Sequence, residues 1–348
     1  MGRVTHADTQ RMMTWLLANR ENVAKYWVTV TAGQTHTINS LGVSEATTVD
    51  WGDGLSNEYT GTATRTHVYA SAGTYEVKIY TPENVTTFDL RDGAAVSVLN
   101  SADLKLMVNV SNFTLYNLTN ATGTLNSADL VDWRPSTLYL HTLTKATVML
   151  DSADMVDWQP DYFTLYNFPN ATITLNSADL VDWRPSGFQL YNLTNATGTF
   201  NSADLVDWRP SNFYIYNLPN ATVMLDSSDM VDWRPSYFRL NTLPIATITI
   251  ATSSIKNWST TTTIDLRTGN LTQLQADLVL WECYQIVRTA TGGSINLSIA
   301  GNAAPSGTFK PATTCPVTSA TPGKEIAYEL LNDGCGKGFN KWATVSTN

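Results

Sequence analysis

The sequence predicts a mainly β fold, in which an N-terminal helix and a small β-sandwich precede a β-solenoid and a small α/β C-terminal cap. Two observations carry this prediction. Residues 26–81 alternate apolar and polar side chains, as in Tyr26-Trp27-Val28-Thr29-Val30, which is the period of half-buried strands. A 25-residue segment that starts at Asn112 recurs without insertion at 137–161, 162–186, 187–211 and 212–236. A fixed period without gaps indicates similar coils in a one-dimensional stack.

Composition excludes several classes of partner. The chain has 348 residues with 30 acidic and 21 basic side chains, for a net charge of −9, and Lys and Arg form no cluster. Because phosphate groups attract clustered positive charge, we expect no nucleic acid and no anionic membrane as principal partner. No apolar stretch approaches the roughly 18 residues of a membrane span, so we expect no membrane insertion. The apolar run at residues 12–18 lacks a small-residue cleavage pattern, which predicts no signal peptide.

The chain begins with a predicted amphipathic helix over residues 5–24. Thr5 and Asp8 can cap its N-terminus, and apolar residues such as Met12 and Leu16 recur at helical spacing. We assign residues 1–25 to this helix, which either packs on the next domain or docks the chain into a larger assembly.

Residues 26–86 form the predicted β-sandwich. Its segment Val49-Asp50-Trp51-Gly52-Asp53-Gly54, followed by His67-Val68-Tyr69-Ala70-Ser71-Ala72-Gly73-Thr74-Tyr75, resembles the signature of polycystic-kidney-disease (PKD) type domains. That resemblance implies an immunoglobulin-like sandwich that serves as a spacer or adhesion module. Trp51 would be a core anchor, and the two glycines would permit a tight turn beside Asp53.

Residues 87–270 form the predicted solenoid of about seven coils, with drifted copies of the repeat at 87–111 and 237–261. Within one copy, Phe113 and Leu115 alternate with polar neighbours, which predicts a strand that ends in a buried polar residue at Asn117. Asn126, or its counterpart Asp151, can cap a short helical or 3₁₀ turn on the convex side, which a following proline ends.

This layout of strand, Asn turn and helical return resembles leucine-rich repeats, and more narrowly the repeats of bacterial surface proteins of the BspA type. In those proteins a PKD-like unit often precedes the array. The sequence departs from the leucine-rich consensus where the turn position changes to Thr142 and Thr242 and where Trp occupies a core slot. A parallel β-helix with a different cross-section is therefore an alternative.

Stacking turns each repeat position into a row of like side chains. The acidic rows are Asp129, Asp154, Asp179, Asp204 and Asp229, and Asp132, Asp157, Asp182, Asp207 and Asp232; the tryptophan row is Trp133, Trp158, Trp183, Trp208 and Trp233. Rows of like charge need compensation. We expect helix N-terminal amides to compensate the first acidic row, and an arginine row (Arg134, Arg184, Arg209 and Arg234) the second. Calcium is the alternative, but the glycine-rich loops of calcium-binding β-rolls are absent. We expect structural ladders, no metal and no cofactor.

An aromatic stripe is predicted along the concave sheet. Its members are Tyr116, Tyr139, His141, Tyr166, Tyr191, Tyr214 and Tyr216. Tyrosines could stack sugar rings or cover a protein partner, since they offer apolar area with a polar tip. In the alternative interpretation, they only stabilise neighbouring strands.

No catalytic residues are predicted. None of the four histidines lies in a metal-binding or nucleophile motif, and an active site repeated in five copies is not expected. Polysaccharide-cleaving β-helices do place paired carboxylates on a solenoid face, so an endoglycosidase is the enzymatic alternative.

Residues 271–348 form the predicted capping module. A helix around 271–288 would carry Leu274, Leu278 and Trp281 on one face, a strand would follow at 295–299, and a second helix at 324–331. The three cysteines permit at most one disulfide, Cys315 with Cys335, or a reduced state. The closing segment contains Gly301-Asn302-Ala303-Ala304-Pro305-Ser306-Gly307, Lys324-Glu325-Ile326-Ala327-Tyr328-Glu329-Leu330 and Gly338-Phe339-Asn340-Lys341-Trp342. It resembles end modules that follow repeat arrays in bacteriophage and phage-derived proteins.

Taken together, these patterns favour a non-enzymatic virion structural protein, such as a head or tail fibre or a decoration protein. The N-terminal helix and sandwich would attach it to other virion proteins in a homo-oligomeric assembly, and the solenoid would project as a rigid binding surface. The alternative is an extracellular or cell-surface adhesin that binds host glycan or protein through the tyrosine stripe.

Overall fold

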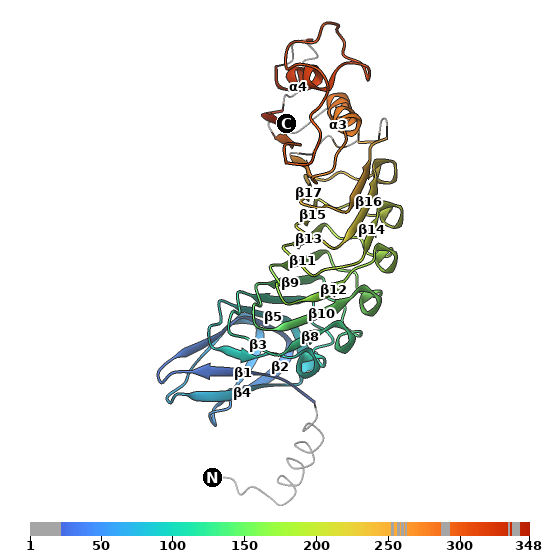
Figure 1. The fold of residues 1–348 in the computed structure, drawn as a ribbon. Coiled ribbons are helices and arrows are strands. Elements are labelled where there is room, and N and C mark those ends of the chain that lie inside the picture. Colours follow the sequence, from blue (N-terminus) through green and yellow to red (C-terminus); the bar gives the residue numbers. More distant parts are fainter. Residues whose placement is uncertain are drawn as a thin grey trace, which may run out of the picture. The chain divides into compact units, whose positions relative to one another are not determined.

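The computed structural model describes residues 22–251, 254–255, 258, 261, 263–286, 293–332, 335 and 342–348 (Figure 1). Strand accounts for 40% of the described residues against 16% helix, so the fold is mainly β, as predicted. The chain divides into two compact units, the first ending at Leu150 and the second beginning at Asp151. The helix predicted over residues 5–24 lies outside the described residues except at its end, where Val23 and Ala24 belong to the first strand.

Antiparallel strands open the first unit. They are β1 (Val23–Val30), β2 (Thr35–Asp50), β3 (Ser56–Val68) and β4 (Gly73–Tyr80). β1 pairs with β4, and β2 pairs with both β3 and β4. Alternate residues of β1 are buried, which matches the predicted period of two.

The turn after β2 has the geometry that its sequence predicts. Trp51 is fully buried, and the Tyr69 hydroxyl donates a hydrogen bond of 2.9 Å to its carbonyl oxygen. The His67 ring stacks on the Trp51 ring and hydrogen bonds to the Asp53 carboxylate at 2.8 Å. Gly52 has φ 83°, and a Cβ there would lie 2.6 Å from the Glu76 carbonyl oxygen, so only glycine fits.

The first unit changes from antiparallel to parallel pairing at β5 (Val85–Arg91), which follows the short 3₁₀ helix η1 (Pro82–Asn84). β5 pairs antiparallel with β2 and parallel with β7 (Asn112–Tyr116), which pairs parallel with β9 (Thr137–His141). The remaining elements are β6 (Val96–Val98), α2 (Ser101–Leu104), β8 (Thr124–Asn126), η2 (Ser127–Asp129) and β10 (Thr147–Asp151). β6 pairs with β1, and β8 pairs parallel with β10.

The second unit repeats one parallel strand per coil in register. These strands are β11 (Tyr162–Tyr166), β13 (Gly187–Tyr191), β15 (Asn212–Tyr216), β17 (Tyr237–Asn241) and β19 (Thr263–Arg267). A second series comprises β12 (Thr172–Thr174), β14 (Thr199–Asn201), β16 (Thr222–Asp226) and β18 (Ala246–Thr249), of which the last three form a parallel sheet. The chain therefore forms the repeated, solenoid-like coils that the 25-residue period predicts.

Five coils return through a short 3₁₀ helix, as expected, and the coil at 87–111 returns through α2. In the second unit these are η3 (Ser152–Met155), η4 (Ser177–Leu180), η5 (Ser202–Leu205) and η6 (Ser227–Met230), and Figure 1 shows them on the side away from β11 to β17. The predicted caps are confirmed: the Asn126 and Asp151 side chains accept hydrogen bonds from the amides of Ala128 and Ala153.

The strand of each coil ends at a residue in the left-handed region. The positive φ recurs at Asp92, Asn117, Thr142, Asn167, Asn192, Asn217 and Thr242. Asn and Asp tolerate this conformation better than most residues. The prediction that Asn117 is buried is wrong, since its side chain is half-buried. The side chain lies at the surface of the stack, where it donates a hydrogen bond of 2.7 Å to Asp92 of the neighbouring coil.

The C-terminal cap contains α3 (Gln273–Gln285), β20 (Ser294–Asn296), α4 (Gly323–Asn332) and β21 (Thr344–Ser346). Both predicted helices are confirmed within the described residues, but the apolar face predicted for the first, which includes Leu274, is not the side that is buried. Leu274 is 69% exposed, whereas Ala276, Val279 and Cys283 are buried. Apolar residues lie all around this helix, so their spacing does not single out one face.

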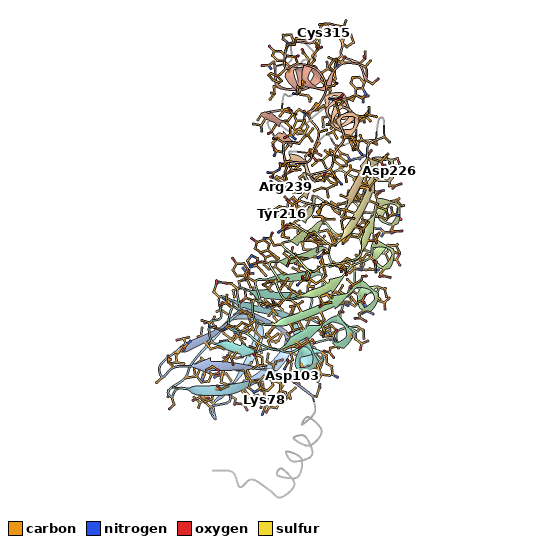
Figure 2. The ribbon with its side chains drawn as sticks, viewed as in Figure 1. Lys78, Asp103, Tyr216, Asp226, Arg239 and Cys315 are labelled. Atoms are coloured by element: carbon orange, nitrogen blue, oxygen red, sulfur yellow. A yellow bond between two sulfur atoms is a disulfide. The ribbon has the colours of Figure 1, made fainter. Side chains whose placement is uncertain are left out.

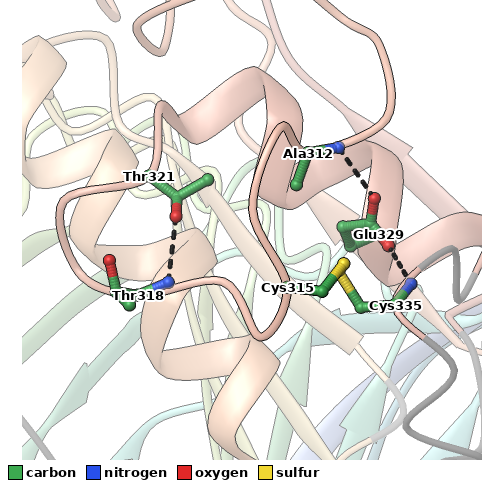
Figure 3. The surroundings of a disulfide bond; sticks show 6 residues. All are labelled: Ala312, Cys315, Thr318, Thr321, Glu329 and Cys335. Carbon is green, nitrogen blue, oxygen red and sulfur yellow. Dashed lines mark hydrogen bonds between the residues drawn. A yellow bond between two sulfur atoms is a disulfide. The ribbon is translucent and has the colours of Figure 1, made fainter.

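Cys315 and Cys335 form a disulfide in the cap (Figure 3). The buried Glu329 carboxylate accepts hydrogen bonds from the amides of Ala312 and Cys335, at 3.0 and 2.8 Å. The disulfide and this carboxylate therefore join the same two segments of the chain.

Buried Asn302 connects the cap to the last coil. Its amide oxygen accepts hydrogen bonds from the backbone amides of Gly269 and Leu271, and its amide nitrogen donates to the carbonyl oxygens of Leu266 and Leu297. All four distances are 3.0 Å or less. The side chain thus pairs with backbone groups that would otherwise have no partner where the series of parallel strands ends.

Candidate functional site

A buried serine hydrogen bonds to at least four of the five aspartates of the first acidic row. In the second unit, Ser177 Oγ donates a hydrogen bond of 2.6 Å to Asp204 Oδ2 and accepts one of 2.8 Å from the amide of Asn201. The same serine-to-aspartate bond recurs for Ser101 with Asp129, Ser152 with Asp179 and Ser202 with Asp229. A hydroxyl of the preceding coil therefore contributes to compensating these carboxylates, which sequence reasoning did not predict. Each carboxylate also lies in the first turn of its 3₁₀ helix, where the expected helix N-terminal amides are.

The second acidic row lies beside arginines, as expected. Arg184 and Arg209 approach Asp207 and Asp232 of the next coil at 3.2 and 3.3 Å. Arg184 Nη1 also donates to the carbonyl oxygens at the end of its own 3₁₀ turn. These pairs are exposed, so each contributes little beyond orienting the guanidinium.

The tryptophan row lies inside the coils. Trp208 Nε1 donates to the Leu180 carbonyl oxygen at 3.3 Å, and its ring meets Phe188 edge to face at 5.1 Å. The equivalent indole hydrogen bonds are made by Trp133, Trp183, Trp233 and Trp258. Each of these five indoles thus fills the core and also satisfies a carbonyl of the coil before it. Trp158 of the same row is equally buried, but its Nε1 has no hydrogen-bond partner among the described residues.

The predicted stripe residues of the first unit lie on the outward face of β7 and β9. Tyr116 stacks on His141 with 4.4 Å between centroids, and the Tyr139 ring lies 6.1 Å from each of the two. The interplanar angles are 27° or less, so the rings cover one another. Burial among them lowers the pKa of His141. This cluster fits the interpretation that the aromatic residues stabilise neighbouring strands.

The stripe residues of the second unit are arranged differently. Tyr191 lies 5.5 Å from Tyr166, 5.7 Å from Tyr214 and 6.4 Å from Tyr216, at interplanar angles from 49° to 83°. Tilted rings leave edges and hydroxyls open to solvent, and Tyr216 is 37% exposed. Figure 2 shows Tyr216 and Arg239 on one side of this unit and Asp226 on the other. The outward face of the second unit is therefore the better candidate binding surface.

Two further tyrosines and an arginine extend this face. Tyr162 and Tyr237 occupy the first outward position of their strands and are 44% and 37% exposed. Arg239 lies between Tyr214 and Tyr237. Sequence reasoning missed these three, although the period of two places all of them outward.

The serine row was also missed. Ser127, Ser152, Ser177, Ser202 and Ser227 are at most 1% exposed. Their signal is visible in the sequence, because a serine recurs at the same position of all five copies between residues 112 and 236, directly after the Asn or Asp at the N-cap position.

The described residues include no group of three or more His, Cys, Asp or Glu placed to hold a metal ion. Among the same residues, the helices are all too short or too polar to cross a membrane.

No protein-family model matches this chain, and no curated protein and no solved structure matches it either.

Proposed function

We propose that this protein is a non-enzymatic structural protein of a virion, in a head or tail fibre or as a decoration protein, and that its stacked coils carry a binding face. The non-enzymatic part of this proposal rests on the contacts that the repeated polar residues make between coils. Asp204 and Asp207 each bond to a residue of the preceding coil; the serine contact recurs at Asp129, Asp179 and Asp229, and the arginine contact at Asp232. Polar residues that make the same stacking contact in several coils are explained by stability alone.

The binding face in this proposal is the outward side of β11, β13, β15 and β17. Exposed aromatic groups with polar tips, such as Tyr216 and Tyr237, favour contact with a partner over solvent exposure. The strands beneath pair with neighbours on both sides, which fixes the spacing of these side chains.

We also infer that the fold consists of a PKD-type domain followed by leucine-rich-repeat-like coils of the BspA type. The buried Trp51 with its glycine turn supports the first part. A left-handed Asn at the strand end and a 3₁₀ return support the second.

The virion setting is supported by the resemblance of the C-terminal segment to end modules of bacteriophage proteins. In this setting, the N-terminal region would attach the chain to other virion proteins as a homo-oligomer. The alternative is a cell-surface adhesin, which the exposed tyrosines of the second unit also favour.

Density-gradient fractionation of the source culture tests the setting. An antiserum raised against the purified chain should detect it in the particle fraction, and gold-labelled antibody should mark the particles in negative-stain electron microscopy. Antiserum depleted with the purified protein is the control. Detection only in the cell-envelope fraction would contradict the virion assignment and support the adhesin.

A further inference from the structure

Arg239 is held on the outward face of the second unit by aromatic rings alone. Its guanidinium carbon lies 5.1 Å from the Tyr214 ring centroid and 5.8 Å from that of Tyr237, within the range of cation–π contacts. The side chain is exposed, and among the described residues it has no hydrogen bond or ion pair. Its N–H donors therefore remain open to solvent.

The other arginines in the described part of the chain have a structural partner. Arg91 and Arg267 pair with Asp89 and Asp265 on their own strands, at 2.9 and 2.6 Å. Arg184 caps carbonyl oxygens and pairs with an aspartate. The two rings thus hold Arg239 in place while its N–H donors remain unused, as expected of a residue that binds a ligand.

The local charge on this face is positive. The charged side chains on the outward positions of β11 to β19 are Arg239, Arg267 and Asp265, two cations and one anion, which leaves one net positive charge. The whole chain carries −9. An anionic ligand would be repelled by most of the protein and attracted here.

The groups around Arg239 suit a carbohydrate. Tyr214, Tyr216 and Tyr237 offer partly exposed rings, and Gln189 and Asn212 add amide groups on the same face. The backbone groups of β13, β15 and β17 are used by strand pairing on both sides. An extended peptide binds a sheet through a free edge, which this face does not offer, whereas a sugar binds through side chains.

We propose that the outward face of β13 to β19 binds an acidic oligosaccharide, with a uronic-acid carboxylate on Arg239 and sugar rings against Tyr214, Tyr216 and Tyr237. Arg239 supplies parallel N–H donors that match the two carboxylate oxygens. This inference rests on the proposed binding face and names its ligand class.

Isothermal titration calorimetry on the full chain tests it, with a galacturonic-acid hexamer as the acidic probe and the matching galactose hexamer as the neutral one. We expect the acidic probe to bind and higher salt to weaken its binding. Arg239→Gln should reduce the affinity by about 10- to 100-fold, the effect of one charge-assisted hydrogen-bond pair. Tyr214→Ala should weaken it as well, whereas Tyr214→Phe should retain most of it.

Arg209→Gln is the matched control, because Arg209 is exposed on the 3₁₀ side of the same unit. It should bind the acidic probe like the unaltered chain. Thermal melting of each variant checks that it folds.

Equal binding of both probes, or an unchanged affinity in Arg239→Gln, would overturn the acidic ligand and leave the proposed binding face standing. Binding of neither probe would overturn the carbohydrate assignment. The virion assignment has its own test, particle fractionation, so its failure can be distinguished from failure of the carbohydrate proposal.

Discussion

The serine row gives the sharpest test of how the coils are held together. Ser177→Ala removes one hydroxyl that is 1% exposed. The Asn201 amide then loses its acceptor at 2.8 Å, and the Asp204 carboxylate loses its donor at 2.6 Å. A buried amide without a partner costs about 1 to 3 kcal/mol. Asp204 is half-exposed, so water replaces part of its bond. We expect the variant to be less stable by about 2 kcal/mol.

Urea denaturation followed by tryptophan fluorescence measures this loss, since the indoles lie inside the coils. Ser211→Ala is the control, because Ser211 is exposed and its side chain makes none of the hydrogen bonds found among the described residues. Its stability should stay within about 0.5 kcal/mol of the unaltered chain. If Ser177→Ala behaves like Ser211→Ala, the serine row does not hold the coils and the reasoning is refuted.

Four further predictions follow from the contacts of single residues. Trp208→Ala should destabilise by about 3 to 5 kcal/mol, since it empties a core position, and Trp208→Phe by less; denaturant midpoints measure both. Gln159 stands where other coils have arginine, so Gln159→Arg should gain about 0.2 to 1 kcal/mol from a new pair with Asp182, and an unchanged midpoint would contradict this. Burial lowers the pKa of His36 from 6.5 to about 4, so the stability that its neutral form contributes is complete above 6.5 and declines as the pH falls toward 4. The loss is about 1.4 kcal/mol per unit, and stability measured against pH should be flatter in this window for His36→Gln. Asn302→Ala should cost about 3 kcal/mol and speed hydrogen exchange in β19 but not in β13; equal exchange in both variants would count against its role.

Much of the fold follows from the sequence because one period recurs. A fixed spacing of 25 residues places Trp208 under Trp233 whatever the cross-section of the coil. The proline that ends each repeat and the capping Asn or Asp before it predict a short helical return, which the structure has. These signals lie within one repeat, so they can be recognised without knowing the contacts between coils.

The contacts between coils could not be predicted in the same way. The bond from Ser177 to Asp204 joins residues 27 apart, and this offset depends on the exact height of the 3₁₀ turn. The rings around Arg239 likewise come from two strands, and only the register brings them together. In α3, apolar residues lie on every side, so the sequence does not determine which face of the helix is buried. Leu274 is exposed.

Deletion of one complete coil, residues 187–211, tests the central claim most directly. The deletion joins Ser186 to Asn212, the same two residue types that meet at positions 211 and 212, so the remaining coils can stack with the same contacts. We expect far-UV circular dichroism, scaled for length, to be unchanged and the variant to unfold cooperatively, because each coil contacts only its neighbours. A variant that is unfolded or aggregated would contradict the account, since it would mean that this unit has one indivisible core.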